Sequence, residues 1–295
     1  MNQIKLIAAV IFSGVLSLNA VYAQETKQAT TSTPTATPTQ AHSTIRVERL
    51  SASIAQVHFF NAPINFIVPE TIAALNDAVK ALSKDEQIKV VIFVSDMNGY
   101  FFNHFDTNQF PAFLGQSGTD NRPLWVELIT NLSNASFVTI ASIRGRTQGG
   151  GNELTLAFDL RYASKENAIF DQPEVGIGLF PGGGGTDMLT RLTGRDRALE
   201  AFLSSDDYSA ELAEKYGWVT RVLPDAQLDG FVERMARRLS SFDKAALVTT
   251  KQRINETVFP KEAERMVSYS AFTKSLSWPA AALACLWQDV PKRRT

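Results

Sequence analysis

Two kinds of hydrophobic pattern alternate along residues 45–143 of this sequence. Residues 45–60 are rich in β-forming side chains with partial alternation, which predicts a hairpin or two strands. Residues 69–82 place apolar side chains three and four positions apart behind Pro69, so a helix is expected there. The next run, 89–94, is short and almost wholly apolar, as buried parallel strands are. The order strand, helix, buried strand therefore opens the folded part of the chain.

The alternation continues beyond this strand. Residues 121–132 predict a second helix, and residues 137–143 predict a further buried strand. Strands that alternate with helices favour right-handed β-α-β units and a largely parallel sheet, so the fold class is predicted to be α/β. From Thr186 onward the chain is mostly helical in pattern, with a short strand around 217–224 and helices at 186–192, 195–203, 210–216, 228–240, 244–255, 260–276 and 280–287.

The N-terminal residues do not share this pattern. Lys5, the apolar stretch 6–18 and the small residues near Ala23 are typical of a secretory signal, so 1–23 is predicted to be cleaved off and the protein exported to the periplasm. The alternative is an uncleaved segment that tethers the protein to a membrane, although the stretch is short for a span. Residues 24–43 are rich in Thr, Gln, Ser and Pro and are predicted to be a disordered linker.

Composition and charge bound the remaining part of the chain. Its length fits one domain, which we expect to have a core over 44–255 and a helical C-terminal region over 256–295. The whole sequence has 29 basic and 30 acidic residues without a Lys/Arg block, so nucleic-acid binding is not expected. The single Cys285 provides no disulfide framework, and the three histidines form no Cys/His cluster or HExxH motif, so no metal site is predicted.

A glycine triplet at 149–151 is the clearest candidate for a functional loop. It follows the strand predicted at 137–143 and precedes residues with helical spacing. Glycines let the backbone approach a ligand, and the first amides of a helix have no intrahelical partner. Glu153 lies one turn inside this helix and could act on the same ligand. The alternative is an ordinary glycine-rich turn beside a solvated carboxylate.

Downstream motifs separate these alternatives. Gln172-Pro173-Glu174 follows residues 168–171, and a glycine-rich run extends to Thr186. From about Arg46 to about Asn255 this ordered series resembles the crotonase family, the enoyl-CoA hydratases and isomerases. The resemblance implies a crotonase-like spiral of β-β-α units with C-terminal helices that trimerise, and therefore a homotrimer or hexamer. It also implies an acyl-CoA thioester as substrate and no separate cofactor, because CoA is part of the substrate.

The resemblance implies an oxyanion hole made by two backbone N–H groups. One donor is at Gly150, and the other lies in a loop where the family shows Phe-x-x-Gly-Ala-Asp. This sequence has Phe101 and Asp106 at the ends of that motif, which places the second donor at Phe105. His104 then replaces a glycine that is free to adopt positive φ. We expect an exposed loop histidine; the alternative is a histidine that touches the acyl group and titrates near neutral pH.

The two glutamates, Glu153 and Glu174, are the predicted catalytic residues. In hydratases of the family two glutamates hold one water, whereas the second glutamate alone is typical of isomerases. Paired carboxylates in a dry pocket push one pKa upward, so one of them can stay protonated near neutrality. Asp171 replaces the usual glycine and adds negative charge beside them. The sequence therefore predicts a lyase that hydrates a 2-enoyl-CoA.

Other functions remain open at this point. An exported enzyme would lack a ready supply of CoA thioesters, so a non-catalytic binding or scaffold protein that keeps the fold is one alternative. Another family reaction, isomerisation or thioester hydrolysis, is a second alternative. Serine proteases of related fold are a third, for which no serine with a credible base is present. The four glycines at 182–185 do not match a phosphate-binding P-loop and are expected to form a turn that seats the following helix.

Overall fold

A computed structural model of the 295-residue chain describes residues 44–281. The predicted signal segment 1–23, the linker 24–43, Cys285 and most of the helix predicted at 280–287 lie outside these residues. Within them, each helix is too short or too polar to cross a bilayer.

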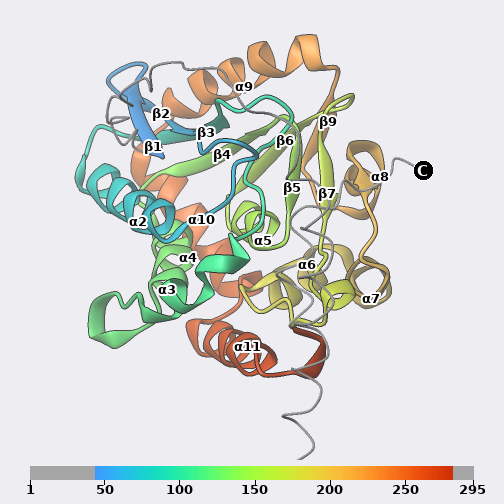
Figure 1. Cartoon of the computed structure of the whole chain (residues 1–295). Helices are drawn as coiled ribbons and strands as arrows, with labels where there is room; N and C mark the ends of the chain where they lie inside the picture. The colour runs from blue at the N-terminus through green and yellow to red at the C-terminus, as the bar shows by residue number, and fades with distance from the viewer. Residues whose placement is uncertain (1–43, 282–295) are drawn as a thin grey trace, which may run out of the picture. The chain divides into compact units, whose positions relative to one another are not determined.

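The main sheet has six strands, of which five run parallel (Figure 1). The hairpin predicted at 45–60 is its edge, where the first two strands pair antiparallel. The parallel register then places Val57 beside Phe93 and Phe93 beside Ala141. In spatial order the strands are β1 (Ile45–Arg49), β2 (Ile54–Phe59), β3 (Val90–Ser95), β4 (Val138–Ile143), β6 (Leu160–Ser164) and β9 (Arg221–Leu223).

A second, three-stranded sheet begins where β4 ends. Its strands are β5 (Arg146–Gln148), β7 (Ile169–Asp171) and β8 (Tyr208–Ser209). Gly145 turns the chain from β4 into β5 with φ +90, and a Cβ there would lie 2.2 Å from the carbonyl carbon of Gly99. Each main-sheet strand β4 and β6 is thus followed at once by a strand of the small sheet, which gives the β-β-α units of the predicted crotonase-like α/β fold.

Ten helices surround the two sheets within the described residues. Most agree with the predicted segments to within a few residues, but α3 at 110–115 was not predicted, and the helix predicted at 121–132 begins later, behind Pro123. Alpha-helical bounds are α2 (Pro69–Lys84), α3 (Phe110–Gly115), α4 (Leu124–Asn134), α5 (Gly150–Leu156), α6 (Gly185–Thr193), α7 (Arg195–Ser204), α8 (Ala210–Tyr216), α9 (Asp225–Ser240), α10 (Lys244–Val258) and α11 (Glu262–Ser275).

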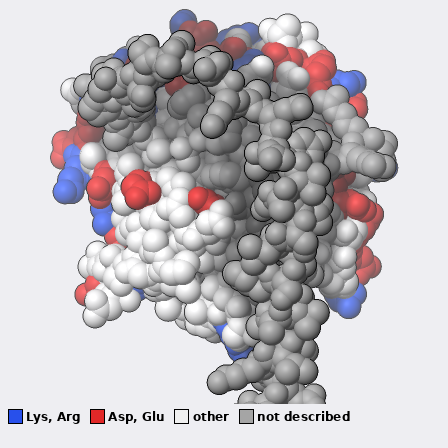
Figure 2. Space-filling view, in the orientation of Figure 1, with Lys and Arg blue, Asp and Glu red and all other residues white. Residues whose placement is uncertain are grey.

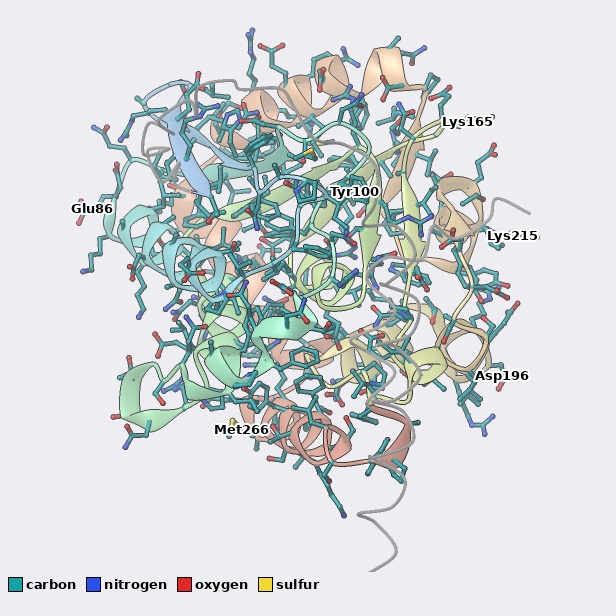
Figure 3. The ribbon with its side chains drawn as sticks, viewed as in Figure 1. Glu86, Tyr100, Lys165, Asp196, Lys215 and Met266 are labelled. Atoms are coloured by element: carbon teal, nitrogen blue, oxygen red, sulfur yellow. The ribbon has the colours of Figure 1, made fainter. Side chains whose placement is uncertain are left out.

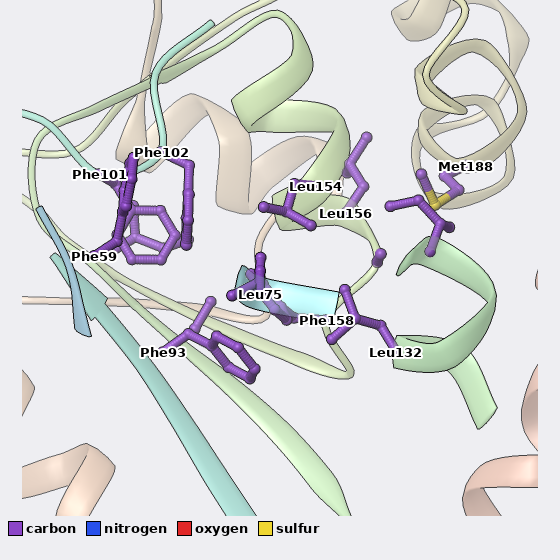
Figure 4. Close-up of a cluster of buried hydrophobic side chains, with 14 of the residues drawn as sticks. Phe59, Leu75, Phe93, Phe101, Phe102, Leu132, Leu154, Leu156, Phe158 and Met188 are labelled. Carbon is purple, nitrogen blue, oxygen red and sulfur yellow. The ribbon is translucent and has the colours of Figure 1, made fainter. Parts of the chain in front are cut away.

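Each face of the main sheet has its own apolar core. Side chains of a strand alternate between faces, so in β3 Val90 and Ile92 point to one side and Val91 and Phe93 to the other. Helix α9 covers the first side. Helices α2, α4 and α5 cover the second, where Phe93 packs against Phe158 with ring centroids 4.3 Å apart (Figure 4). Helix α5, with the glycine triplet, is therefore fixed between a core and the small sheet.

Charged residues are unevenly distributed over the surface. Glu86, Lys165, Asp196 and Lys215 lie at the edge of the molecule in Figure 3, whereas Tyr100 lies near the middle of the view. On the face seen in Figure 2, the area over α3 carries almost no charged residues. This uncharged area adjoins the elements that line the candidate site.

Candidate active site

One pocket brings together the four residues predicted from the sequence, Phe105, Gly150, Glu153 and Glu174. Its walls come from the loop before α3, the start of α5, the segment after β7 and helix α11. Apart from the carboxylates the lining is mainly apolar and rich in aromatic side chains, which are Phe105, Phe110, Phe113, Trp125, Phe180, Tyr269 and Phe272. Such a site offers an apolar body and a few convergent polar groups, the usual composition of a small-molecule site.

The start of α5 depends on glycines for steric reasons. Gly149 caps the helix with φ 52 and ψ −131, a backbone conformation that side chains disfavour. Gly151 leaves no room for a Cβ, which would lie 2.1 Å from the carbonyl oxygens of Phe102 and Asn103. Gly150 between them is the first helical residue, so its N–H lacks an intrahelical acceptor. The triplet thus packs the helix end directly against the 101–106 loop.

Glu153 is held by a second glycine segment. Its Oε1 accepts hydrogen bonds from the N–H groups of Gly183 at 2.8 Å and Gly185 at 2.9 Å. Burial raises the pKa of Glu153 to about 7, although these two amides favour its ionised form. A Cβ at Gly183 would lie 2.2 Å from Oε2 of Glu153. The glycines predicted only to seat the next helix also hold this carboxylate, and α6 begins at Gly185.

Glu174 lines the same pocket but has different hydrogen-bond donors. Its Oε2 accepts one hydrogen bond, from Nε2 of Gln172 at 3.1 Å. Burial and the negative charge of Glu153 raise the pKa of Glu174 well above its usual range, and Asp171 adds to the effect. The negative charge expected from Asp171 therefore does act on a neighbouring carboxyl. The two glutamates differ in donors: two backbone amides face Glu153, and one side-chain amide faces Glu174.

The loop that carries Phe105 is anchored by Asn65. This residue adopts the left-handed conformation with φ 55, which asparagine tolerates better than most residues. Its side-chain NH₂ donates to Ser95 Oγ at 2.8 Å and to the backbone carbonyl of Phe101 at 2.9 Å. Its backbone carbonyl accepts from the N–H of Asn103 at 3.1 Å. The loop is also tied to β5, because Phe101 N–H donates to Arg146 O at 2.8 Å. These bonds set the direction of the loop before it reaches the pocket.

The N–H of Phe105 points away from the segment that supports it. Ile67 donates to the carbonyl of His104 at 3.0 Å and accepts from the N–H of Asp106 at 2.9 Å. As on any strand, the residue between those two groups presents its N–H to the opposite side. Within residues 44–281 neither this N–H nor that of Gly150 has an acceptor. The ring of Phe105 packs on Gly150, where a Cβ would lie 2.5 Å from it.

His104 differs from the expectation. It is 7% exposed, so the interpretation as an exposed loop histidine is wrong. Its backbone is not left-handed, because the β-bridge with Ile67 holds this stretch extended. The ring packs on Phe66 with centroids 4.8 Å apart, and Nδ1 lies 2.8 Å from the carbonyl of Phe105. Since a carbonyl only accepts, Nδ1 carries the proton. His104 thus lines the pocket without the strain that its replacement of glycine suggested.

Helix α11 closes the pocket from within the same chain. Tyr269 and Phe272 line it, and Phe272 meets Phe110 edge to face at 5.6 Å. Met266, on the same helix, lies at the lower side of the view in Figure 3. Part of the apolar surface of this helix is therefore the wall of the site.

Three positions that support the site were not singled out from the sequence. Trp125 donates from Nε1 to the carbonyl of Gly183 at 2.9 Å and so steadies the glycine segment. Asn152, inside the glycine motif, accepts from Trp218 Nε1 at 2.9 Å. No local pattern reveals these pairs, since 58 and 66 positions separate their members. The four consecutive glycines were the one visible signal.

This arrangement suits acid–base chemistry on a substrate with a developing oxyanion. Two amides on adjoining walls could receive the oxyanion. Two carboxylates with unequal donors could share the work of base and acid. Within residues 44–281 no group of three His, Cys, Asp or Glu side chains is placed to hold a metal ion.

Comparison with known proteins places this geometry in context. The enoyl-CoA hydratase/isomerase family model matches residues 49–276. A probable mitochondrial enoyl-CoA hydratase of Dictyostelium discoideum is 29% identical over 194 residues, which cover 65% of this chain and 68% of that protein. A crotonyl-CoA hydratase of Syntrophomonas wolfei is 29% identical over 202 residues, covering 68% and 77%.

A solved structure extends the similarity over more of the chain. The crystal structure of a putative enoyl-CoA hydratase from Streptomyces avermitilis superposes with a TM-score of 0.80 and 39% sequence identity. The alignment covers 88% of this chain and 95% of that one.

Proposed function

The chain belongs to the enoyl-CoA hydratase/isomerase family, and we propose that it hydrates a 2-enoyl-CoA thioester. The observation that carries the proposal is the pair of buried carboxylates, Glu153 and Glu174, on one pocket with unequal hydrogen-bond donors. An isomerase of this family needs one such group, so two of them favour the addition of water.

Glu153 is the general base in this proposal. The two backbone amides on its Oε1 favour the ionised form, so it can accept a proton from a water held between the glutamates. The water oxygen then bonds to the β-carbon of the enoyl group, and the carbon–carbon double bond becomes an enolate. Glu174, whose pKa is raised further by the charge of Glu153, is protonated and delivers its proton to the α-carbon.

The enolate oxygen would lie between the N–H groups of Phe105 and Gly150. Each preorganised donor of this kind contributes about 3 kcal/mol to transition-state stabilisation. The aromatic lining would exclude bulk water and hold the acyl chain. His104 would lie beside this oxygen site through its bond to the Phe105 carbonyl.

The test is isosteric removal of each carboxylate. Glu153→Gln and Glu174→Gln should each lower kcat for crotonyl-CoA hydration by about 10²–10⁴-fold, measured by loss of the enoyl-thioester absorbance. The double variant should lose less than the product of the single losses, because both groups act on one water. Glu86→Gln, on an exposed residue, is the matched control.

Two outcomes would contradict hydration. Wild-type rates in both glutamine variants would remove the carboxylates from the mechanism. A wild-type protein that binds CoA thioesters but hydrates none would instead support the non-catalytic binding protein. Conversion of 3-enoyl to 2-enoyl substrates without hydration would support an isomerase.

We further propose export of the protein. The signal-like pattern of 1–23 supports this proposal. Mass spectrometry of protein from its native host should find a chain that starts near Gln24. A full-length product in the cytosol would refute export.

A further inference from the structure

A line of hydrogen bonds leads from the core to Glu174. Trp218 Nε1 donates to Asn152 Oδ1 at 2.9 Å, and Asn152 Nδ2 donates to Gln172 Oε1. Gln172 Nε2 then donates to Glu174 Oε2 at 3.1 Å. Trp218, Asn152 and Gln172 are all fully buried, so water does not compete for these groups. We call these four residues the Trp218 relay.

The chemistry of the first member fixes the direction of the whole relay. An indole N–H can only donate, so Asn152 must present its oxygen to Trp218. Its amide NH₂ then faces Gln172, which must answer with its own oxygen. Gln172 is left with its NH₂ toward Glu174. A reversed amide anywhere along the line would set two donors or two acceptors against each other in a dry interior.

Trp218 itself is held independently of the pocket. Its backbone N–H donates to the carbonyl of Ala213 at 2.8 Å, and its backbone carbonyl accepts from Arg161 Nε at 2.9 Å. Its ring packs beside Phe170 and Tyr208, with centroids 5.9 and 5.5 Å away. The origin of the relay is therefore a rigid part of the fold outside the site.

We propose that Trp218 is a positioning residue, which acts through Asn152 and Gln172 to keep a hydrogen-bond donor aimed at Glu174. The consequence for rate rests on the proposed hydration, whereas the consequence for Glu174 itself does not. With the relay intact, Gln172 stabilises the carboxylate form of Glu174 and fixes Oε2. Without the Trp218 donor, the side-chain amides of Asn152 and Gln172 can both reverse. Gln172 then presents its oxygen to Glu174, and only the protonated carboxyl can donate a hydrogen bond to that oxygen.

The sign of the expected change follows from this. Loss of a donor to the charged form raises the pKa of a carboxyl. Other titratable groups near Glu174 are Glu153 on α5, Asp171 at the end of β7 and His104 in the neighbouring loop. Replacement of the Trp218 ring by phenylalanine alters none of them, so a shift at Glu174 would report the relay.

The experiment compares Trp218→Phe with Tyr208→Phe, which removes a hydroxyl from the same aromatic cluster but lies outside the relay. Glutamate carboxyl carbons labelled with ¹³C are titrated by NMR, and the Glu174 signal is assigned by its absence in Glu174→Gln. In Trp218→Phe the Glu174 midpoint should rise by about one pH unit, the effect of one hydrogen bond to a charged group. The Tyr208→Phe midpoint should stay at the wild-type value.

Kinetics provide a second readout. Trp218→Phe should lower kcat about tenfold with an unchanged KM and a pH profile displaced in the same direction as the Glu174 midpoint. Because Trp218 acts only through Gln172, the double variant Trp218→Phe/Gln172→Met should be no slower than Gln172→Met alone. If Trp218→Phe does not fold, judged by circular dichroism, Asn152→Leu breaks the next link and carries the same expectations.

The outcomes separate the two proposals. A midpoint shift in a protein that hydrates no enoyl-CoA would refute hydration and leave the relay standing. An active enzyme whose Glu174 midpoint and pH profile do not move in Trp218→Phe would overturn the relay. Additive losses in the double variant would show that Trp218 acts by another route.

Discussion

Replacing Gly183 by alanine tests whether the glycine segment holds Glu153 for catalysis. The new methyl group would lie 2.2 Å from Oε2 and 2.8 Å from Cδ of Glu153. Ordinary contacts begin at 3.4 Å, so the carboxylate must move by about 1 Å. The backbone of Gly183 is not left-handed, which means that alanine adds no backbone strain there.

The size of the effect follows from the bonds that this movement breaks. Glu153 would lose at least one of its two amide donors, and a hydrogen bond to a charged group contributes about 1.5–3 kcal/mol. If the loss falls on the transition state, kcat drops by about 10- to 100-fold. The pKa of Glu153 is about 7 in the wild type and should rise in the variant, because the loss of a donor destabilises the ionised carboxylate. Activity should therefore recover partly as the pH is raised.

The assay is crotonyl-CoA hydration across a pH range, with circular dichroism to verify folding. Gly230→Ala in the middle of α9 is the matched control, because a Cβ there meets only the end of Arg234 at 3.4 Å. A Gly183→Ala protein with the wild-type rate and pH profile would refute the role assigned to this segment.

Three further predictions concern stability and assembly. Asn65→Ala removes three side-chain hydrogen bonds and leaves an alanine in the left-handed conformation. Urea unfolding should therefore show a decrease of about 3–4 kcal/mol in the free energy of unfolding. A decrease under about 1 kcal/mol would contradict the anchoring role. Glu127 is buried, yet hydrogen bonds from Lys80, Asn76 and Thr119 lower its pKa from 4.5 to about 2. Its contribution to the free energy of unfolding should therefore be complete above pH 4.5 and disappear toward pH 2. This acid dependence should be absent in Glu127→Gln. We also propose a homotrimer or a hexamer, and a monomer in light scattering at micromolar concentration would count against it.

The fold was largely accessible from the sequence because its elements have local signals. The strand predicted at 89–94 is β3 at 90–95, and the helix predicted at 210–216 is α8. β5, β6, β7 and β8 were not predicted as strands. At β5 the reason is clear, because Arg146-Thr147-Gln148 is polar and has no apolar period, although Thr147 and Gln148 are buried in the small sheet. Hydrophobic periodicity cannot identify a strand whose buried side chains are polar.

The site was accessible only in part. Glu153 and Glu174 were chosen by family resemblance, since a separation of 21 positions implies no contact. His104 could not be placed, because its burial results from a β-bridge between its loop and Ile67. The contacts of Gly183 with Glu153 and of Trp218 with Asn152 join segments that meet only after the chain has folded. Tertiary contacts of this kind leave no periodic trace in the sequence.

Helix α11 packs mainly on α4 and α6 and supplies Tyr269 and Phe272 to the pocket, while the two glutamates come from α5 and the segment after β7. Part of the pocket wall is therefore encoded in a different stretch of the chain from the two carboxylates. If the protein has the proposed function, substitutions at Tyr269 or Phe272 would change the space left for the acyl group without replacing either glutamate. For protein engineering, these two positions of α11 are the first to vary when a different acyl group is to be accepted.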